Sequence, residues 1–300
     1  MSDLRKAFVC AGWNLYTLRR NPRFYLGLLL GLLLTWMLTD RTLDIARTFQ
    51  TPLQIMEPFI WCFADGDSIL YASLALMLIL SAFPRLDAAG SYLSFRAGRR
   101  AWLLGQVITV FLITLLYCLM LLLFAMLLGL GNAGFAPAWS DTATLLSFSP
   151  GGFDPAFAVT RKMVKLTLPY PALLTIFTLM FLYMLLLSSI LLSFTLLKSR
   201  KTGTALALLL SLSGFILTPE RFMAWLQLPA DFQFIANLLA AWLSPLQHAT
   251  YIMHNFGYDL LPRIWTSCLI LGGLSAGLLL LAHLRMRHYN YVFSGGFGHE

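Results

Sequence analysis

The sequence predicts an all-α membrane protein with six transmembrane helices, and two observations carry this prediction. Of the 300 residues, 59% are hydrophobic and 11% are charged, whereas soluble domains carry roughly 25% charged residues. The apolar residues fall in long uncharged runs, with Lys and Arg clustered at their ends. A chain of this composition has too few polar residues to cover a soluble core. We therefore attribute the formal charge of +8 to membrane topology and predict no nucleic-acid partner.

The first predicted element is an N-terminal amphipathic interfacial helix over residues 3–20. Its apolar residues recur at helical spacing and would share one face. This face would consist of Leu4, Phe8, Ala11, Leu15 and Leu18. Basic residues flank it, which is typical of a helix lying on the membrane surface, with membrane lipid as its partner. A solvent-facing helix packed on other protein is the alternative. Pro22 then turns the chain into the first span.

The six predicted spans are the apolar runs 24–39, 68–84, 102–128, 171–197, 203–218 and 264–284. The first is slightly shorter than the roughly 20 residues that a span needs. Segment 232–258 is interrupted by Asn, Pro and His residues. Its continuous apolar part is about half a span. We therefore predict a re-entrant or outer-leaflet helical segment there, before the last helix.

The distribution of charge predicts the orientation of these spans. With both termini in the cytoplasm, fourteen of the 21 Lys and Arg residues lie inside, and ten of the 13 acids lie outside. This bias agrees with the positive-inside rule. The weakest point is the long outer loop 131–169, which carries a basic trio. The trio consists of Arg161, Lys162 and Lys165.

The densest polar segment, residues 85–101, lies between the second and third spans. Its charged residues are Arg85, Asp87, Arg96, Arg99 and Arg100. A polar island of this density in an apolar chain indicates an interaction. We predict a cytosolic elbow on which another protein acts.

Three motifs of catalysis and metal binding are absent from the sequence, namely GxxxxGK[ST], HExxH and CxxC. His248 and His254 lie six residues apart, which does not place them on one helix face as metal ligands. We interpret them as loop or interfacial histidines. The four cysteines are interpreted as small buried hydrophobes. No catalytic residue and no metal site is therefore predicted.

Charged residues within the spans would indicate an ion or proton relay, and the predicted spans contain essentially none. This disfavours a secondary transporter. Asp65 and Asp67 precede the second span and are interpreted as solvated boundary acids, with contact to a cationic substrate as the alternative. A membrane-embedded enzyme would need a polar constellation within the bundle. Its candidates, these two acids and the two histidines, are dispersed in the sequence.

The order of these elements resembles the permease subunit of an ABC-2 type (ABCG-like fold) transporter of the small bacterial type. Two stretches carry the resemblance in residues. FRAGRRAWLLGQ, from Phe95 to Gln106, is similar to the segment after the coupling helix of such permeases. SPLQHATYIMHNFGYDLLP, from Ser244 to Pro262, is similar to their stretch before the last span. The loop 131–169 departs from the family, whose corresponding connection is short.

The resemblance implies a dimer of permease protomers, alike or paralogous, that docks on two stand-alone ABC ATPase subunits. ATP and Mg²⁺ would bind to those subunits, so this chain would carry no cofactor. The resemblance also implies that residues 3–20 form the connecting helix. Runs 68–83 and 204–218 would line the path at the dimer interface. The residues implied in ATPase coupling are Arg85, Asp87, Ser91, Tyr92, Arg96, Arg99, Arg100, Lys198, Arg200 and Lys201.

The function implied is transport across a bacterial cell membrane, with export of a peptide, drug-like or lipid-like substrate. No substrate-binding residue is assigned. A membrane-embedded enzyme, a secondary transporter and a non-transporting scaffold remain the alternatives. Copurification of an ATPase would distinguish an ABC transporter permease from these alternatives.

Overall fold

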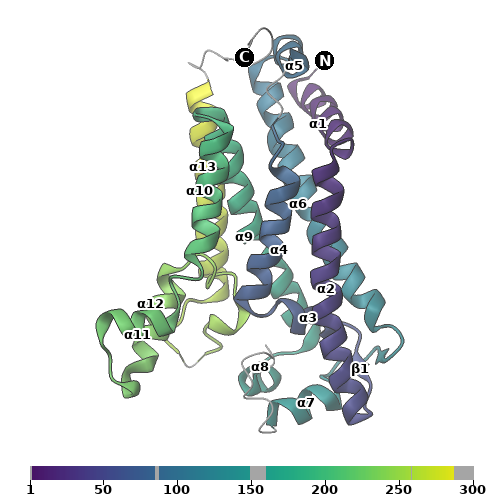
Figure 1. The fold of residues 1–300 in the computed structure, drawn as a ribbon, viewed down its shortest axis with the longest axis vertical. Helices are drawn as coiled ribbons and strands as arrows, with labels where there is room; N and C mark the ends of the chain where they lie inside the picture. The colour runs from purple at the N-terminus through teal and green to yellow at the C-terminus, as the bar shows by residue number, and fades with distance from the viewer. Residues whose placement is uncertain (1, 85–87, 149–159, 258, 287–300) are drawn as a thin grey trace.

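Long helices laid side by side build the molecule (Figure 1). The computed structural model describes residues 2–84, 88–148, 160–257 and 259–286. The bundle consists of α2 (Pro22–Phe49), α4 (Gly66–Leu80), α6 (Arg99–Gly129), α9 (Pro169–Leu197), α10 (Arg200–Ser213) and α13 (Ile264–Met286). Helix α9 has more buried residues than α2, α6 or α13 and packs against α6, α10 and α13.

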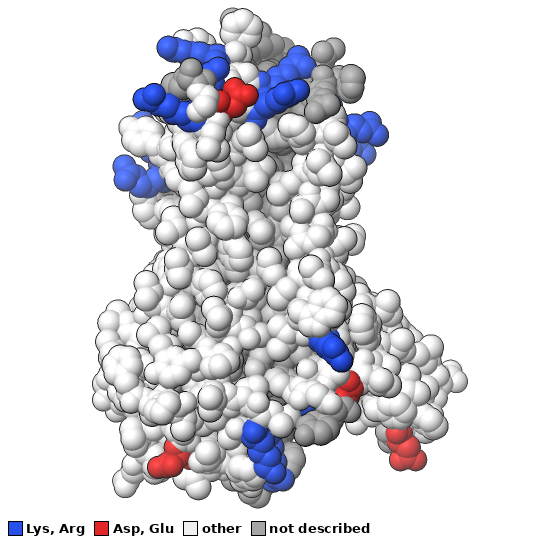
Figure 2. Space-filling model, turned by 180° about the vertical axis from the view of Figure 1, so that it is seen from behind, with Lys and Arg blue, Asp and Glu red and all other residues white. Residues whose placement is uncertain are grey.

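The two ends of the bundle differ in charge. Helices α1 (Asp3–Arg19) and α5 (Ala88–Ala97) lie at one end, together with the C-terminal end of α13 (Figure 1). On the face shown in Figure 2, Lys and Arg gather at this end, above a broad belt without charge. The opposite end carries both signs. A neutral belt between polar ends matches the profile of a bilayer.

Among the described residues, four helices are long and apolar enough to cross a membrane, namely α2, α6, α9 and α13. Three of them agree with the predicted spans 102–128, 171–197 and 264–284 to within three residues. Helix α2 is longer than the predicted 24–39, because the polar stretch that follows continues the helix to Phe49. This polar stretch carries an Arg47–Asp44 ion pair one turn apart.

The predicted second span is a bent pair of helices. Helix α3 (Glu57–Phe63) meets α4 at an angle of 88°. Asp65 begins α4 as its N-cap, with the carboxylate accepting a hydrogen bond from the Ser68 backbone N–H at 3.0 Å. Helix α4 ends at Leu80 rather than at residue 84. Counted together, the pair raises the number of candidate spans in the described chain to five.

The predicted fifth span, 203–218, is not one of these candidates. Helix α10 has 14 residues and would be about 21 Å long, against a hydrocarbon core of about 30 Å. Turns after Ser213 lead directly into α11 (Pro219–Leu226). The Thr218 side chain caps α11 by accepting from the Arg221 N–H. The described chain is thus an all-α membrane protein with four or five candidate spans.

The long loop 131–169 forms part of a small cap at the end opposite α1. Two-residue strands β1 (Leu53–Gln54) and β2 (Ala133–Gly134) pair in parallel there. Helices α7 (Asp141–Phe148) and α8 (Arg161–Leu166) complete the described part of the cap. The fully buried carboxylate of Glu57 ties it together. This carboxylate accepts hydrogen bonds from the Ser140 N–H at 2.7 Å, the Ser140 hydroxyl at 2.6 Å and the Gln54 N–H at 3.2 Å.

The basic trio of this loop has local partners. Arg161 Nε donates to the Ser147 carbonyl oxygen at 2.9 Å, in the last turn of α7. Lys165 lies over the Phe148 ring. Lys162 forms an ion pair with Asp259, in the segment before α13. Cations near a helix C-terminus are favoured by the helix dipole. The trio therefore has a structural role that accounts for its place in this loop.

The segment predicted as outer-leaflet helices, 232–258, contains a single α-helix, α12 (Gln233–Leu243). Helix α12 packs on α11, and the two project from the side of the bundle (Figure 1). The short 3₁₀ turn η2 (Ala230–Phe232) precedes α12, and a second 3₁₀ turn, η3 (Tyr251–Met253), follows it. Residues 244–256 are mostly irregular and pack against the α3–α4 bend, where the Tyr251 N–H donates to the Ala64 carbonyl oxygen at 3.1 Å.

Candidate functional site

The basic end of the bundle presents a short helix, α5, joined to α6 by a single glycine. Gly98 is the N-cap of α6 and has φ = 87°. Residues with a side chain rarely adopt this backbone conformation, whereas glycine adopts it freely. No atom lies within 4 Å of where a Cβ would stand at Gly98. Glycine is therefore required here by backbone conformation alone, and it sets the angle between α5 and α6.

Helix α5 exposes large side chains at this end. Phe95 is 91% exposed and Tyr92 is 61% exposed. Arg96 Nη1 donates to the Tyr92 hydroxyl at 3.2 Å, one turn earlier. Phe95 is almost fully exposed and therefore does not contribute to the core. Aromatic and Arg side chains are enriched in protein interfaces. The helix therefore has the properties of a docking surface.

The basic residues next to α5 lie at the starts of helices. Arg99 and Arg100 are the first two residues of α6, and Arg200 and Lys201 are the first two of α10; all four are exposed. A helix N-terminus carries partial positive charge, so cations there oppose the dipole by about 0.3–1 kcal/mol each. Helix stability therefore does not explain them. A negatively charged surface, of lipid or of protein, does.

The residues implied in ATPase coupling fall in two stretches, 85–100 and 198–201, and the structure brings the ends of these stretches close together. Arg200 Nη2 donates to the Pro84 carbonyl oxygen at 3.1 Å, which links the start of α10 to the chain just before α5. Lys198 is the exposed C-cap of α9. Ser91 lies within α5. Arg85 and Asp87 lie outside the described residues.

Helix α1 is held against α6 by a face other than the predicted one. Leu4 and Phe8 are more than half exposed and Leu15 is partly exposed, whereas Ala11 and Leu18 are buried. The buried face consists of Ala7, Cys10, Ala11, Asn14 and Leu18. The contact with α6 uses small residues, which allow close helix packing, and the lipid-facing role of the large apolar residues stays a prediction.

Two features fix α1 on α6. A Cβ at Gly105 of α6 would lie 2.6 Å from the Cys10 Cβ. Asn14 Nδ2 donates to Gln106 Oε1 at 3.2 Å and to Thr109 Oγ1 at 3.0 Å, and all three side chains are buried. Helices α1, α5 and α6 therefore meet at one place, and α6 extends from it for 31 residues, about 46 Å.

A second polar cluster lies in segment 244–256, against α13. His248 and His254 do not act as separate loop residues: both rings contact the hydroxyl of Ser267, each at 2.9 Å. His254 is fully buried and His248 nearly so. Burial lowers the pKa of His248 and lowers that of His254 from 6.5 to about 4.

Comparison of the chain with family models, with curated proteins and with solved structures found no match. The function is therefore argued from the geometry of the chain.

Sequence reasoning missed three features of these sites. The small-residue face of α1 has a detectable pattern, since positions 7, 10, 11 and 14 follow helical spacing. Gly98 stands in the polar segment, where a glycine often marks a change of direction. The convergence of two histidines on Ser267 has no local signal, because the serine lies on another element.

Proposed function

We propose that this chain is the transmembrane permease subunit of an ATP-driven ABC-2 type transporter. It forms the translocation path as a dimer and docks on separate ABC ATPase subunits. The observation that carries the proposal is α5, a short exposed helix at the basic end that leads through Gly98 into the longest helix of the bundle. The exposed aromatic side chains and Arg96 of α5, with Arg99 and Arg100 at the start of α6, offer a contact that a cytosolic partner would use.

The geometry supports a mechanical coupling between partner and bundle. Force on α5 reaches α6 directly, and α1 follows α6 because Asn14 and the Cys10–Gly105 contact join them. Rigid helices that move as bodies between two arrangements are a common means of domain and subunit motion. ATP binding in the partner would thus change which side of the membrane the path faces.

Helices α4 and α10 are the proposed walls of the path. They lie side by side, with Ser73 Oγ and Ser211 Oγ 3.5 Å apart. Tyr71 of α4 and Leu209 and Leu212 of α10 are exposed, so a second protomer would find an apolar surface here. We propose export of a peptide, drug-like or lipid-like substrate from a bacterial cell, with both termini in the cytoplasm and six crossings in total.

The proposal is tested by charge reversal at the start of α6. The double variant Arg99→Glu/Arg100→Glu should retain insertion and bind the ABC ATPase roughly tenfold more weakly, which corresponds to about 1.4 kcal/mol. The measurement is the amount of copurified ATPase and its ATP hydrolysis rate. Arg221→Glu, an exposed arginine on α11 at the projecting arm, is the matched control and should bind normally. Equal ATPase retention in both variants would contradict the proposal.

A further inference from the structure

The contacts of His248, His254 and Ser267 form one continuous chain of hydrogen bonds. At one end, His248 Nε2 lies 3.2 Å from the Trp242 carbonyl oxygen. In the middle, His248 Nδ1 and His254 Nε2 both contact Ser267 Oγ at 2.9 Å. At the other end, His254 Nδ1 lies 2.9 Å from the Thr250 carbonyl oxygen. Turning either ring over would replace these nitrogens by carbons, so the contacts fix the ring orientations.

Counting hydrogens shows that this series of hydrogen bonds lacks one hydrogen. It has four gaps between heavy atoms, from the Trp242 carbonyl to the Thr250 carbonyl, and each gap needs one hydrogen. Two neutral imidazoles supply one hydrogen each and the Ser267 hydroxyl supplies one. Three hydrogens cannot fill four gaps. In the neutral state, one gap therefore holds two lone pairs facing each other.

The distances identify the empty gap. The contacts on Ser267 and Thr250 are all 2.9 Å, whereas the contact between His248 Nε2 and the Trp242 carbonyl is the longest, at 3.2 Å. The His254 ring also lies 3.3 Å from the Tyr251 carbonyl oxygen, which further favours a hydrogen on Nδ1. The neutral chain is then His248 Nδ1–H to Ser267, Ser267 O–H to His254 Nε2, and His254 Nδ1–H to the Thr250 carbonyl.

We infer that His248, Ser267 and His254 form a binding site for a single proton, which is taken up on His248 Nε2 and donated to the Trp242 carbonyl. Uptake fills the last gap without breaking any other bond. Trp242 lies in the last turn of α12, where carbonyls have no intrahelical donor. Positive charge there is favoured by the helix dipole. The bound proton thus links α12 to α13 through the charged His248 ring. This proton site does not depend on the proposed transport function.

Charged residues lie on several of the elements around this site. From α8, Lys162 Nζ lies 3.4 Å from the His254 carbonyl oxygen and is paired with Asp259. The α3–α4 bend carries Asp65, and Arg263 precedes α13. The second imidazole repels a second proton and lowers the pKa of His254 further. Burial lowers the pKa of both rings, so the site is empty at neutral pH and fills in acid.

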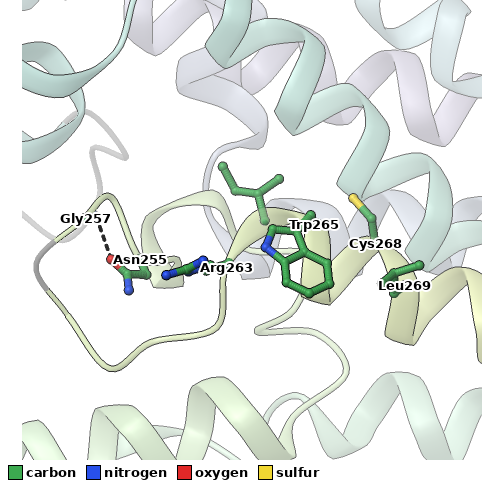
Figure 3. Close-up of a pocket in the computed structure, with 7 residues that line it drawn as sticks. Asn255, Gly257, Arg263, Trp265, Cys268 and Leu269 are labelled. Carbon is green, nitrogen blue, oxygen red and sulfur yellow. Dashed lines mark hydrogen bonds between the residues drawn. The ribbon is translucent and has the colours of Figure 1, made fainter.

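An open groove of about 900 Å³ lies next to the segment that carries the buried rings (Figure 3). Its lining includes Asn255 and Cys268, the chain neighbours of His254 and Ser267. Figure 3 shows Arg263 and Trp265 beside the same hollow. The groove thus comes within one residue, along the chain, of two members of the site.

The test is ¹⁵N spectroscopy of the purified full chain, labelled at its five histidines and titrated from neutral to acidic pH. Single His→Gln variants assign the signals. At neutral pH both His248 and His254 should carry their proton on Nδ1. On acidification His248 should take up one proton first, while His254 stays neutral. A neutral His248 protonated on Nε2, or His254 titrating before His248, would overturn the inference.

A pair of serine variants separates this site from a merely structural contact. Ser267→Ala removes the acceptor for Nδ1–H, so neutral His248 should change to the Nε2–H form and its acid step should move down by about one pH unit. Ser275→Ala is the control, because this buried serine of the same helix bonds only to its own turn, with Oγ donating to the Leu271 carbonyl at 2.7 Å. An unmoved His248 step in Ser267→Ala would overturn the inference.

Discussion

Glu57 shows how one buried residue can organise a whole cap. Its carboxylate has no cationic partner among its described contacts and is held by three hydrogen bonds from Ser140 and Gln54. These bonds join β1 and the start of α3 to the chain after β2, and Glu57 and Ser140 lie 83 positions apart. A buried carboxylate is stable only when its lone pairs are satisfied in this way.

The substitution Glu57→Gln should therefore destabilise the protein. The amide keeps the shape, but in either orientation its NH₂ group faces a backbone N–H, of Ser140 or of Gln54, which leaves buried groups unpaired at a cost of about 1–3 kcal/mol. A lower melting temperature in detergent or nanodiscs is the expected result. Glu220→Gln, at an exposed position in the first turn of α11, should melt like the unaltered protein. Equal melting of both variants would show that the Glu57 contacts contribute nothing.

His254 makes stability depend on pH. Burial lowers its pKa from 6.5 to about 4, so the unfolded chain binds this proton more tightly than the folded chain does. The contribution is fully present above pH 6.5 and is lost as pH falls from 6.5 towards 4. The melting temperature of the unaltered protein should therefore fall more steeply over this range than that of His254→Gln. Comparing the two slopes removes the effect of titrating groups outside the His248–Ser267–His254 site, and parallel slopes would contradict the assignment.

At the scale of elements, the orientation of α5 depends on Gly98. Gly98→Ala introduces no clash, since the position is open, but it places a side chain at φ = 87°. The strain is on the order of 1 kcal/mol and is relieved by turning α5 relative to α6. We expect normal insertion and melting with weakened ATPase binding. The measurement is the same copurification as for Arg99 and Arg100, with Gly131→Ala, also an open position, as control. Normal ATPase binding by Gly98→Ala would mean that the α5 angle is unimportant.

The sequence predicted most elements because long apolar runs and clustered charges are local signals. The bounds of α6 and α9 follow from where the charges stop. The α3–α4 bend and the buried face of α1 depend on what packs against them, so no local pattern contains them. The same holds for the candidate site: α5 falls within a visible polar island, but the Arg200–Pro84 contact spans 116 positions.

At the scale of the whole molecule, the direction of the helices constrains the number of crossings. Arg200, at the start of α10, contacts Pro84 at the α5 end, and α13 also ends there (Figure 1). Helices α9 and α13 therefore both run towards the basic end. The chain must return between them, over residues 198–263. Helix α10 is the part that lies in the bundle, although its 14 residues are fewer than a span usually needs.

We therefore expect α10 to cross, with α11 lying at the opposite surface. A short helix can cross here because α4 and α9 flank α10, so lipid does not surround it on every side. Where lipid does contact α10, local thinning of the bilayer can match its length. In a cysteine-free background, Tyr92→Cys and Lys201→Cys should react with a membrane-impermeant maleimide only after the cells are permeabilised. Glu220→Cys should react in intact cells. If Glu220→Cys instead requires permeabilisation, α10 turns back within the membrane and the six-crossing topology fails. If Tyr92→Cys reacts in intact cells, α5 faces away from ATP and the proposed coupling fails with it.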